Sequence, residues 1–217
     1  MKSMKLFWQD PSANKKITDS LQKNEILITT TDTIPGFLAN VTQQGFDRLN
    51  DIKCGRQDKP YIILVSDTSK LDYFLGIQSL YPDIQKILEA SWPGPLTAIF
   101  KARPDLPDFL KSSQGTIALR CPRHSGLLSL LKNLPGLFST SANKSAQPAP
   151  KTISEVAPEV LLQVSRVVQD QQEILQPKPS TILDFSRYVQ DKKIYLVREG
   201  AYSLAELEQI SGLEIIK

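Results

Sequence analysis

The sequence predicts an α/β fold in which helices cover one or both faces of a mixed β-sheet. Short apolar runs rich in β-branched residues, typical of buried strands, alternate with segments whose apolar residues recur at helical spacing. The last strand-like runs follow each other at a spacing typical of a hairpin, which favours a mixed over a wholly parallel sheet. The chain has 217 residues, of which 41% are hydrophobic. This is enough for a sizeable core, and we expect a single domain over residues 1–217.

Residues 1–95 show the patterns of four helices and two strands. Each helix has apolar residues at three- and four-residue steps or a suitable end, such as the N-cap residue Thr42 and the stop at Gly76. Each strand is a short apolar run bounded by turn-forming residues. The predicted helices span residues 12–24, 42–53, 71–75 and 84–92, and the predicted strands span residues 25–30 and 61–65.

Residues 96–217 show more strands than helices. Ser203 and Glu206 have the spacing of a capping box at the start of the last helix, and Thr152 with Glu155 has the same spacing for an earlier helix. Residues 146–150 form a loop that is best placed to act as a lid over a ligand. Strands are predicted over residues 96–100, 116–120, 137–138, 164–168, 180–185 and 193–197, and a further helix over residues 125–131.

Charge and rare residues narrow the class of protein. The net charge of +3 suits anionic ligands or weak RNA contact, and it falls short of a surface built for nucleic acid. Cys54 and Cys121 form no CxxC pair and are interpreted as packing residues, and no signal peptide or membrane-spanning run is visible, so we expect a soluble, cytoplasmic protein. The single histidine, His124, argues against a histidine triad or a multi-histidine zinc site and favours a structural hydrogen bond.

Polar and cationic side chains gather where predicted strands begin or end. Lys53, Arg56 and Lys59 precede the strand at 61–65, and three cations at the entrance to a core favour a phosphate or carboxylate site. A solvated basic loop explains this spacing equally well. Ligand crevices in α/β sheets form at strand ends, however, and similar groups recur at other ends. These groups are Thr31, Thr33, Thr97, Arg120, Ser139, Ser141, Asn143, Ser180 and Arg198.

Two observations limit this interpretation. Taken alone, Thr31 and Thr33 are better explained as an ordinary turn in which short polar side chains cap the backbone. Neither GxxxxGK[ST] nor GxGxxG occurs, so a nucleotide would be held in another way.

Seven short segments, spread in order over about 170 residues, form the most specific pattern in the chain. They are TTDTIPGF at 30–37, IKCGRQDKP at 52–60, WPGPLTAIF at 92–100, IALRCPRH at 117–124, FSTSANKS at 138–145, PSTILDF at 179–185 and VREGA at 197–201. Together they resemble the YrdC-like family of threonylcarbamoyl-AMP synthases, and the length resembles its short single-domain type.

The resemblance implies a twisted sheet around a basic, concave site. There, threonine, bicarbonate and ATP would give threonylcarbamoyl-AMP and pyrophosphate, for formation of N6-threonylcarbamoyladenosine at position 37 of transfer RNA. Such chemistry depends on holding a labile carbamate in line with the α-phosphorus and on cations that absorb developing charge. By similarity, the catalytic residues are Lys53 and Arg56, and ATP is bound by Lys53, Arg56, Lys59, Thr97, Ser141, Asn143 and Arg198. Threonine or its carbamate would be held by Thr31, Thr33, Arg120, Ser139 and Ser180.

The resemblance also implies partners. Mg²⁺ would accompany ATP, and a separate tRNA threonylcarbamoyl transferase would use the product, with weak RNA or tRNA binding and no membrane contact. The alternative is an RNA-binding or ribosome-associated module of the same fold that has lost synthesis. The sequence departs from the family pattern at Thr30, Pro35 and Ala146, and Arg56 is displaced by one residue, which a bulge at Gly55 would absorb.

Overall fold

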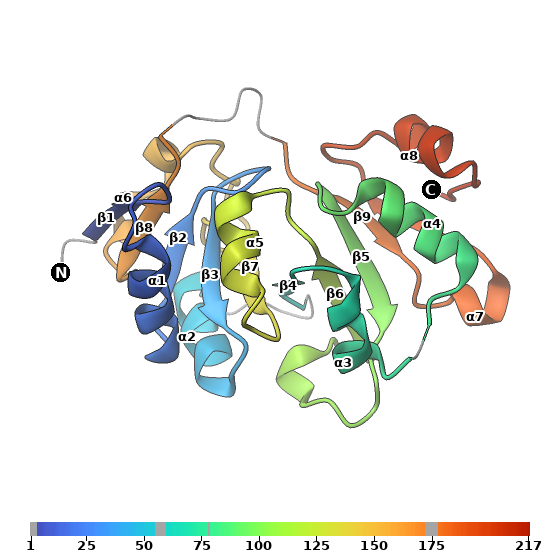
Figure 1. Cartoon of the computed structure of the whole chain (residues 1–217), viewed down its shortest axis with the longest axis horizontal. Helices are drawn as coiled ribbons and strands as arrows, with labels where there is room; N and C mark the ends of the chain where they lie inside the picture. The colour runs from blue at the N-terminus through green and yellow to red at the C-terminus, as the bar shows by residue number, and fades with distance from the viewer. Residues whose placement is uncertain (1–3, 55–59, 78, 172–177) are drawn as a thin grey trace.

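One mixed sheet runs through the whole molecule. The structure is a computed structural model that describes residues 4–54, 60–77, 79–171 and 178–217. Its strands are β1 (Met4–Phe7), β2 (Leu27–Thr29), β3 (Gly36–Asn40), β4 (Ile62–Leu64), β5 (Leu96–Lys101), β6 (Thr116–Arg120), β7 (Leu137–Ser141), β8 (Arg166–Gln169), β9 (Thr181–Asp184) and β10 (Tyr195–Arg198). They form a ten-stranded sheet in the order β1-β8-β2-β3-β7-β4-β6-β5-β9-β10, so β1 and β10 lie at opposite ends (Figure 1).

Helices flank this sheet on both faces. They are α1 (Ala13–Gln22), α2 (Gln43–Lys53), α3 (Leu71–Leu75), α4 (Pro82–Ser91), α5 (Ser125–Leu131), α6 (Pro158–Leu161), α7 (Tyr188–Asp191) and α8 (Leu204–Ser211). In Figure 1, α1 and α5 lie side by side over the strands at the N-terminal end of the sheet, and α4 lies beside α8 at the other end. The α/β class and the twisted, mixed sheet with flanking helices are therefore confirmed.

The strands are continuous apolar runs because both faces of the sheet are buried. Along β2, Leu27 belongs to the core under α1 and α5, whereas Ile28 belongs to the larger core on the opposite face. Phe138 and Leu137 of β7 divide in the same way. A strand that is covered on both faces needs apolar residues at every position, which is why these strands show no alternation of polar and apolar residues.

Three of the predicted helix ends follow the local rules that the sequence indicated, and one does not. The Thr42 side chain accepts a hydrogen bond from the Gly45 amide at the start of α2, and Ser203 with Glu206 forms a complete capping box on α8. Gly76 ends α3 in the left-handed conformation at φ 64°. The capping-box prediction for Thr152 and Glu155 is wrong: Ile153–Glu155 forms one 3₁₀ turn, and the Glu155 carboxylate accepts from the Lys151 amide instead.

Two strands escaped the sequence analysis, and both lie beside the candidate site. β1 pairs with β8 in parallel, and β3 pairs antiparallel with β2 and with β7. The strand expected at 137–138 also continues to Ser141, because its backbone pairs with β3 as far as Gly36. The end of the sheet that contains β1 is thus completed by strands whose own sequences give only a weak strand pattern.

Candidate functional site

A buried arginine joins two loops that the sheet order separates. Strands β3, β7 and β4 lie between β2 and β6, yet Arg120 at the end of β6 reaches the loop that follows β2. Its Nη2 donates to Asp32 Oδ1 at 2.6 Å, its Nη1 to Thr33 Oγ1 at 3.0 Å and its Nε to the Gly94 carbonyl at 3.2 Å. Because neighbouring strands twist relative to one another, the sheet can bring these distant loops together on one side.

The electrostatics of this cluster are set by burial. Arg120 is 5% exposed, and its burial lowers the pKa of the guanidinium while the adjacent Asp32 carboxylate opposes that change. A guanidinium has five N–H donors and remains charged in proteins. Three donors are used in the contacts above, so two remain for a ligand. A buried, partly unsatisfied guanidinium is suited to binding a carboxylate.

The hydroxyl groups of Thr31 and Thr33 form a chain that starts at Arg120. Thr31 Oγ1 donates to the Ile34 carbonyl at 2.9 Å and lies 3.0 Å from Thr33 Oγ1. Because the Thr31 proton goes to Ile34, the Thr33 hydroxyl donates to Thr31 while it accepts from Arg120. Both predicted residues are therefore brought to Arg120, and their hydroxyls shape the loop as the simpler turn interpretation also predicted.

Lys53 lies in a second cluster, at the C-terminal end of β7. Its ammonium donates to the Ser141 carbonyl at 3.1 Å, to the Asn143 carbonyl at 2.6 Å and to Asn143 Oδ1 at 3.1 Å, and its side chain is buried. Ser141 Oγ also donates to Asn143 Oδ1, at 2.6 Å. The three residues predicted to bind ATP here are brought together, and Lys53 holds the backbone of the loop that contains the other two.

A third cluster lies between β5, β9 and β10. Thr97 Oγ1 and Ser180 Oγ are 2.8 Å apart and buried, and Arg198 Nη2 donates to the Ser180 carbonyl at 2.7 Å. A Cβ on Gly200 would lie 2.2 Å from the Pro179 carbonyl oxygen, so only glycine lets the chain after β10 pass this close. All three predicted residues are brought together, although Arg198 itself is largely exposed.

Short backbone links join the three clusters. The Ala142 amide donates to the Pro35 carbonyl at 3.1 Å, which connects the loop held by Lys53 to the loop after β2. Gly94, which accepts from Arg120, adjoins Pro95, whose carbonyl accepts from the Thr181 amide at 2.9 Å. Ser139 is buried on β7, and a Cβ on Gly36 would lie 3.2 Å from its hydroxyl oxygen. Arg56, Lys59 and the expected bulge at Gly55 lie outside the described residues.

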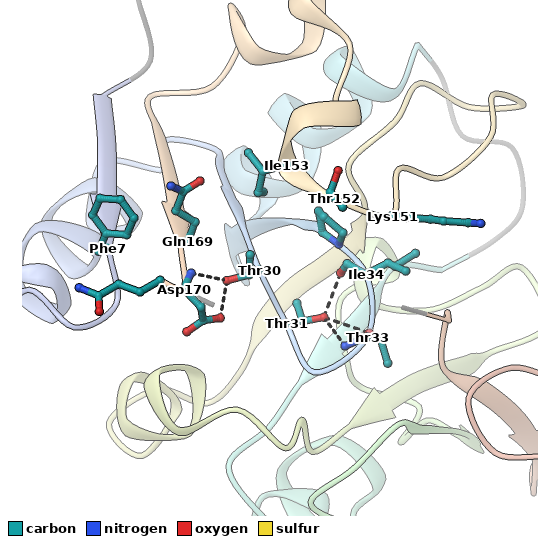
Figure 2. A pocket seen from close by; sticks show the side chains of 12 residues that line it. Phe7, Thr30, Thr31, Thr33, Ile34, Lys151, Thr152, Ile153, Gln169 and Asp170 are labelled. Carbon is teal, nitrogen blue, oxygen red and sulfur yellow. Dashed lines mark hydrogen bonds between the residues drawn. The ribbon is translucent and has the colours of Figure 1, made fainter. Parts of the chain in front are cut away.

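A pocket of about 160 Å³ opens beside the loop after β2 (Figure 2). Thr31 and Thr33 line it, together with residues that sequence analysis did not select: Phe7, Thr30, Ile34, Pro35, Lys151, Thr152, Ile153, Gln169, Asp170 and Gln171. Asp170 follows β8 directly, so its position at a strand end was a signal by which the sequence could have indicated it. Asp32 was missed because its partner, Arg120, is 88 residues away in the chain.

His124 has the structural role that the sequence analysis preferred. Its Nδ1 accepts from the Leu127 amide at 3.1 Å and so caps α5, and its Nε2 lies 3.0 Å from Asp170 Oδ2. Since Nδ1 is an acceptor, the neutral ring carries its proton on Nε2 and donates to Asp170. Asp170 Oδ2 also accepts from Thr30 Oγ1 at 2.7 Å. This carboxylate is thereby fixed at the wall of the pocket.

The two cysteines differ. Burial, together with the nearby Asp67 and Asp32 carboxylates, raises the pKa of the Cys121 thiol to about 12, so it stays protonated and unreactive at neutral pH. Cys54 is exposed, and the prediction that it is a packing residue is wrong. It adopts the left-handed conformation, φ 58°, directly after α2.

Comparison with known proteins identifies the family. The sequence model of the Sua5, YciO and YrdC proteins, which is described as "Telomere recombination", matches residues 19–200. A protein of Methanocaldococcus jannaschii that is provisionally named a threonylcarbamoyl-AMP synthase is 31% identical over 211 residues, which cover 95% of this chain and 96% of that protein. The chain belongs to the Sua5/YciO/YrdC family.

Other family members are similar over different shares of their length. A threonylcarbamoyl-AMP synthase of Nitrosococcus oceani is 32% identical over 111 residues, which cover 51% of this chain and 59% of that protein. Sua5 of P. abyssi, solved in complex with L-threonine, has a TM-score of 0.83 at 22% identity, and 99% of this chain covers 62% of it. E. coli YciO has a TM-score of 0.74 at 19% identity and covers 94% of this chain and 98% of its own. These structures share the fold.

Two kinds of feature were not found in the part of the chain that the structure describes. None of its helices is both long and apolar enough to cross a membrane. No group of three or more histidine, cysteine, aspartate or glutamate side chains within those residues is arranged to hold a metal ion.

Proposed function

We propose that the protein is a nucleotidyltransferase that makes threonylcarbamoyl-AMP from L-threonine, bicarbonate and ATP, for N6-threonylcarbamoyladenosine formation in transfer RNA. The observation that carries the proposal is the buried Arg120, which Asp32 and Thr33 orient and which retains two N–H donors. The names of the family relatives support the same activity. They do not favour the alternative of an RNA-binding module without synthesis.

Each cluster supplies one requirement of this reaction. The fork of Arg120 binds the threonine carboxylate, and the buried hydroxyls of Ser139 and Ser180 hold the same substrate. The loop from Ser141 to Asn143 contacts the nucleotide, with Lys53 holding its backbone. Arg198, in the third cluster, contacts the same nucleotide from the side of β10. Arg56 and Lys59, which lie outside the described residues, are proposed to contact the phosphates.

The proposed reaction needs no side-chain nucleophile. The threonine amine condenses with bicarbonate to give a carbamate and water, and a carbamate oxygen then attacks the α-phosphorus of ATP. The new P–O bond forms as the bond to pyrophosphate breaks. The rate gain comes from holding the two reactants in line and from cations that stabilise the leaving group. Mg²⁺ enters as part of the ATP substrate, and the product passes to a separate tRNA threonylcarbamoyl transferase.

Pyrophosphate release tests the proposal. The purified protein should release pyrophosphate from ATP only when threonine and bicarbonate are both present. Serine should be a poorer substrate, because loss of one methyl group from a fitted site costs on the order of 1–3 kcal/mol. Equal release without threonine or bicarbonate would overturn the proposed function.

A further inference from the structure

Two contacts hold the loop after β2 to other parts of the chain. In the first, the Asp32 carboxylate accepts from Arg120 Nη2 and, through Oδ2, from the Arg123 amide at 2.9 Å. In the second, Thr30 is joined to Asp170 (Figure 2). The loop is thus attached on both sides of the residue that lies between Thr30 and Asp32.

Thr30 and Asp170 exchange two hydrogen bonds. Thr30 Oγ1 donates to Asp170 Oδ2 at 2.7 Å and accepts from the Asp170 amide at 3.0 Å, so the hydroxyl uses its one proton and one acceptor position on the same residue. Thr30 follows β2 and Asp170 follows β8, and these two strands pair in parallel. The two bonds therefore extend the contact between the strands beyond their last paired residues, Thr29 and Val168.

His124 connects Asp170 to the turn between β6 and α5. Its Nε2 donates to Asp170 Oδ2 at 3.0 Å, while its Nδ1 accepts from the Leu127 amide as the cap of α5. The cap thus sets which nitrogen carries the proton and how the ring is turned. The Trp8 ring packs against the imidazole, with 5.1 Å between the two ring centroids. Asp170 is therefore held by a side chain that is itself fixed by two neighbours.

Both contacts of the loop lead to one short segment, residues 120–124. Arg120 is the last residue of β6 and His124 is the N-cap of α5, so both ends of the segment are anchored. Its middle is anchored too, because the Cys121 carbonyl accepts from the Gly94 amide at 2.8 Å. A loop attached at two points to a fixed segment has little conformational freedom, whereas a loop attached at one point can move about that point. Loss of either attachment should therefore loosen the loop that orients Arg120.

We propose that Asp170 is a positioning residue for the threonine site: through Thr30 and His124 it holds the loop after β2 in the conformation that orients Arg120 toward the threonine carboxylate. The inference rests on the proposed function for the presence of threonine. Asp170 acts by accepting hydrogen bonds rather than by its charge, because the two groups that its Oδ2 accepts from, a hydroxyl and a neutral imidazole, are uncharged. An uncharged side chain that accepts the same two bonds should therefore replace it.

Two variants of Asp170 separate hydrogen bonding from charge. Asp170→Ala removes the acceptor, so the KM for threonine in pyrophosphate release should rise roughly tenfold or more, while the KM for ATP should change less than about threefold. Asp170→Asn has an amide oxygen that can accept both bonds, and it should keep the threonine KM within about threefold of the wild-type value. Asp191→Ala is the matched control. The Asp191 carboxylate also accepts from a hydroxyl, that of Tyr195 at 2.8 Å, but it lies on α7 at the other end of the sheet, and its removal should leave the threonine KM unchanged.

Thr30→Val tests the other partner of the same link. Valine keeps the shape of threonine and lacks the hydroxyl, so the threonine KM should rise, by no more than in Asp170→Ala. Because both variants break one link, the double variant should be little worse than Asp170→Ala alone. Fully additive losses would show that the two residues act separately, and would overturn the inference.

Hydrogen exchange reports on the loop without turnover. The Thr33 amide donates to Thr31 Oγ1 at 3.0 Å and the Arg123 amide donates to Asp32, so both amides should exchange roughly tenfold faster or more in Asp170→Ala. Unchanged exchange would overturn the inference. Faster exchange with an unchanged threonine KM would overturn it as well, because Asp170 would then support the fold alone.

Threonine binding, measured by calorimetry, separates the inference from the proposed function. If the wild type binds threonine but releases no pyrophosphate, only the proposed reaction fails, and the Kd for threonine replaces KM in each comparison above. A wild type that binds no threonine overturns both. If Asp170→Asn binds threonine as weakly as Asp170→Ala, the effect belongs to the charge and the hydrogen-bonding role is wrong.

Discussion

Lys53 and Arg120 are both buried cations, yet they are stabilised in different ways. The described hydrogen bonds of the Lys53 ammonium go to three uncharged oxygens of a single loop, whereas Arg120 donates to a carboxylate, a hydroxyl and a carbonyl from two separate segments. An ammonium has three N–H donors, the number that these contacts require, while a guanidinium has five. The comparison indicates that Lys53 fixes the shape of the loop after β7, and that Arg120 fixes the loop after β2 and also retains two N–H donors.

The largest effect is expected from removing the charge that neutralises Arg120. The Arg120 side chain is only 6% exposed, and Asp32→Asn removes the carboxylate that neutralises it. Breaking a buried ion pair in this way costs about 3–5 kcal/mol of folding free energy. Urea unfolding of the variant and the wild type measures the loss. Asp105→Asn, which breaks an ion pair whose carboxylate is 72% exposed, is the control and should change stability by less than about 1 kcal/mol. Equal effects for both would refute the role given to Asp32.

Replacing the fork of Arg120 should affect threonine more than ATP. Arg120→Lys keeps the charge but cannot form two parallel bonds to a carboxylate, so the KM for threonine should rise roughly tenfold or more with little change in the KM for ATP. Arg123→Lys is the matched control, because Arg123 is exposed and its side chain donates to the Pro93 carbonyl. An unchanged threonine KM in Arg120→Lys would reassign this residue to structure alone.

A smaller, coupled effect is expected at Lys53. If Lys53 acts through the loop, Lys53→Met and Asn143→Ala should each lower kcat/KM for ATP, and the double variant should be little worse than either single one. The coupling energy in such a cycle should be about 0.5–3 kcal/mol. Independent, additive losses would instead show that Lys53 contacts the nucleotide directly.

The smallest effect tests the loop itself. Ala146 has φ 65°, a left-handed conformation that glycine adopts without steric cost. Ala146→Gly should therefore raise stability, or leave it unchanged, within about 1 kcal/mol. Ala205→Gly, inside α8, should lower stability by about the same amount because glycine is unfavourable in a helix. A clear loss of stability in Ala146→Gly would contradict the inference that the left-handed conformation strains the backbone at Ala146.

Local chemistry explains which parts of the fold the sequence could predict. The cap at Thr42, the capping box at Ser203 and the stop at Gly76 depend on residues three or four positions apart, and each is present. β3 was missed because Pro35 and Gly36 favour a turn, and the apolar run Phe37–Ala39 follows that turn directly. Thr152 and Glu155 had the right spacing, but Pro158 begins a separate helix and leaves room for one turn only.

The candidate site was predictable where its members follow strands, and hidden where they meet across the sheet. Polar residues at strand ends indicated Arg120, Ser180 and the loop after β7, and the structure brings their neighbours together as expected. The partnership of Asp32 with Arg120 depends on the twist accumulated over the intervening strands, and no sequence spacing records it. The meeting of Phe7 with Gln169 depends likewise on the position of β8 between β1 and β2.

That position of β8 has a consequence for synthesis of the chain. β1 and β2 are not neighbours, and each pairs in parallel with β8, whose residues are Arg166–Gln169. During translation the first two strands therefore leave the ribosome long before the strand that joins them. Contacts this distant in sequence form slowly, because a long loop must close first. Until about three quarters of the chain has emerged, the edge of β2 stays open to pairing with other chains.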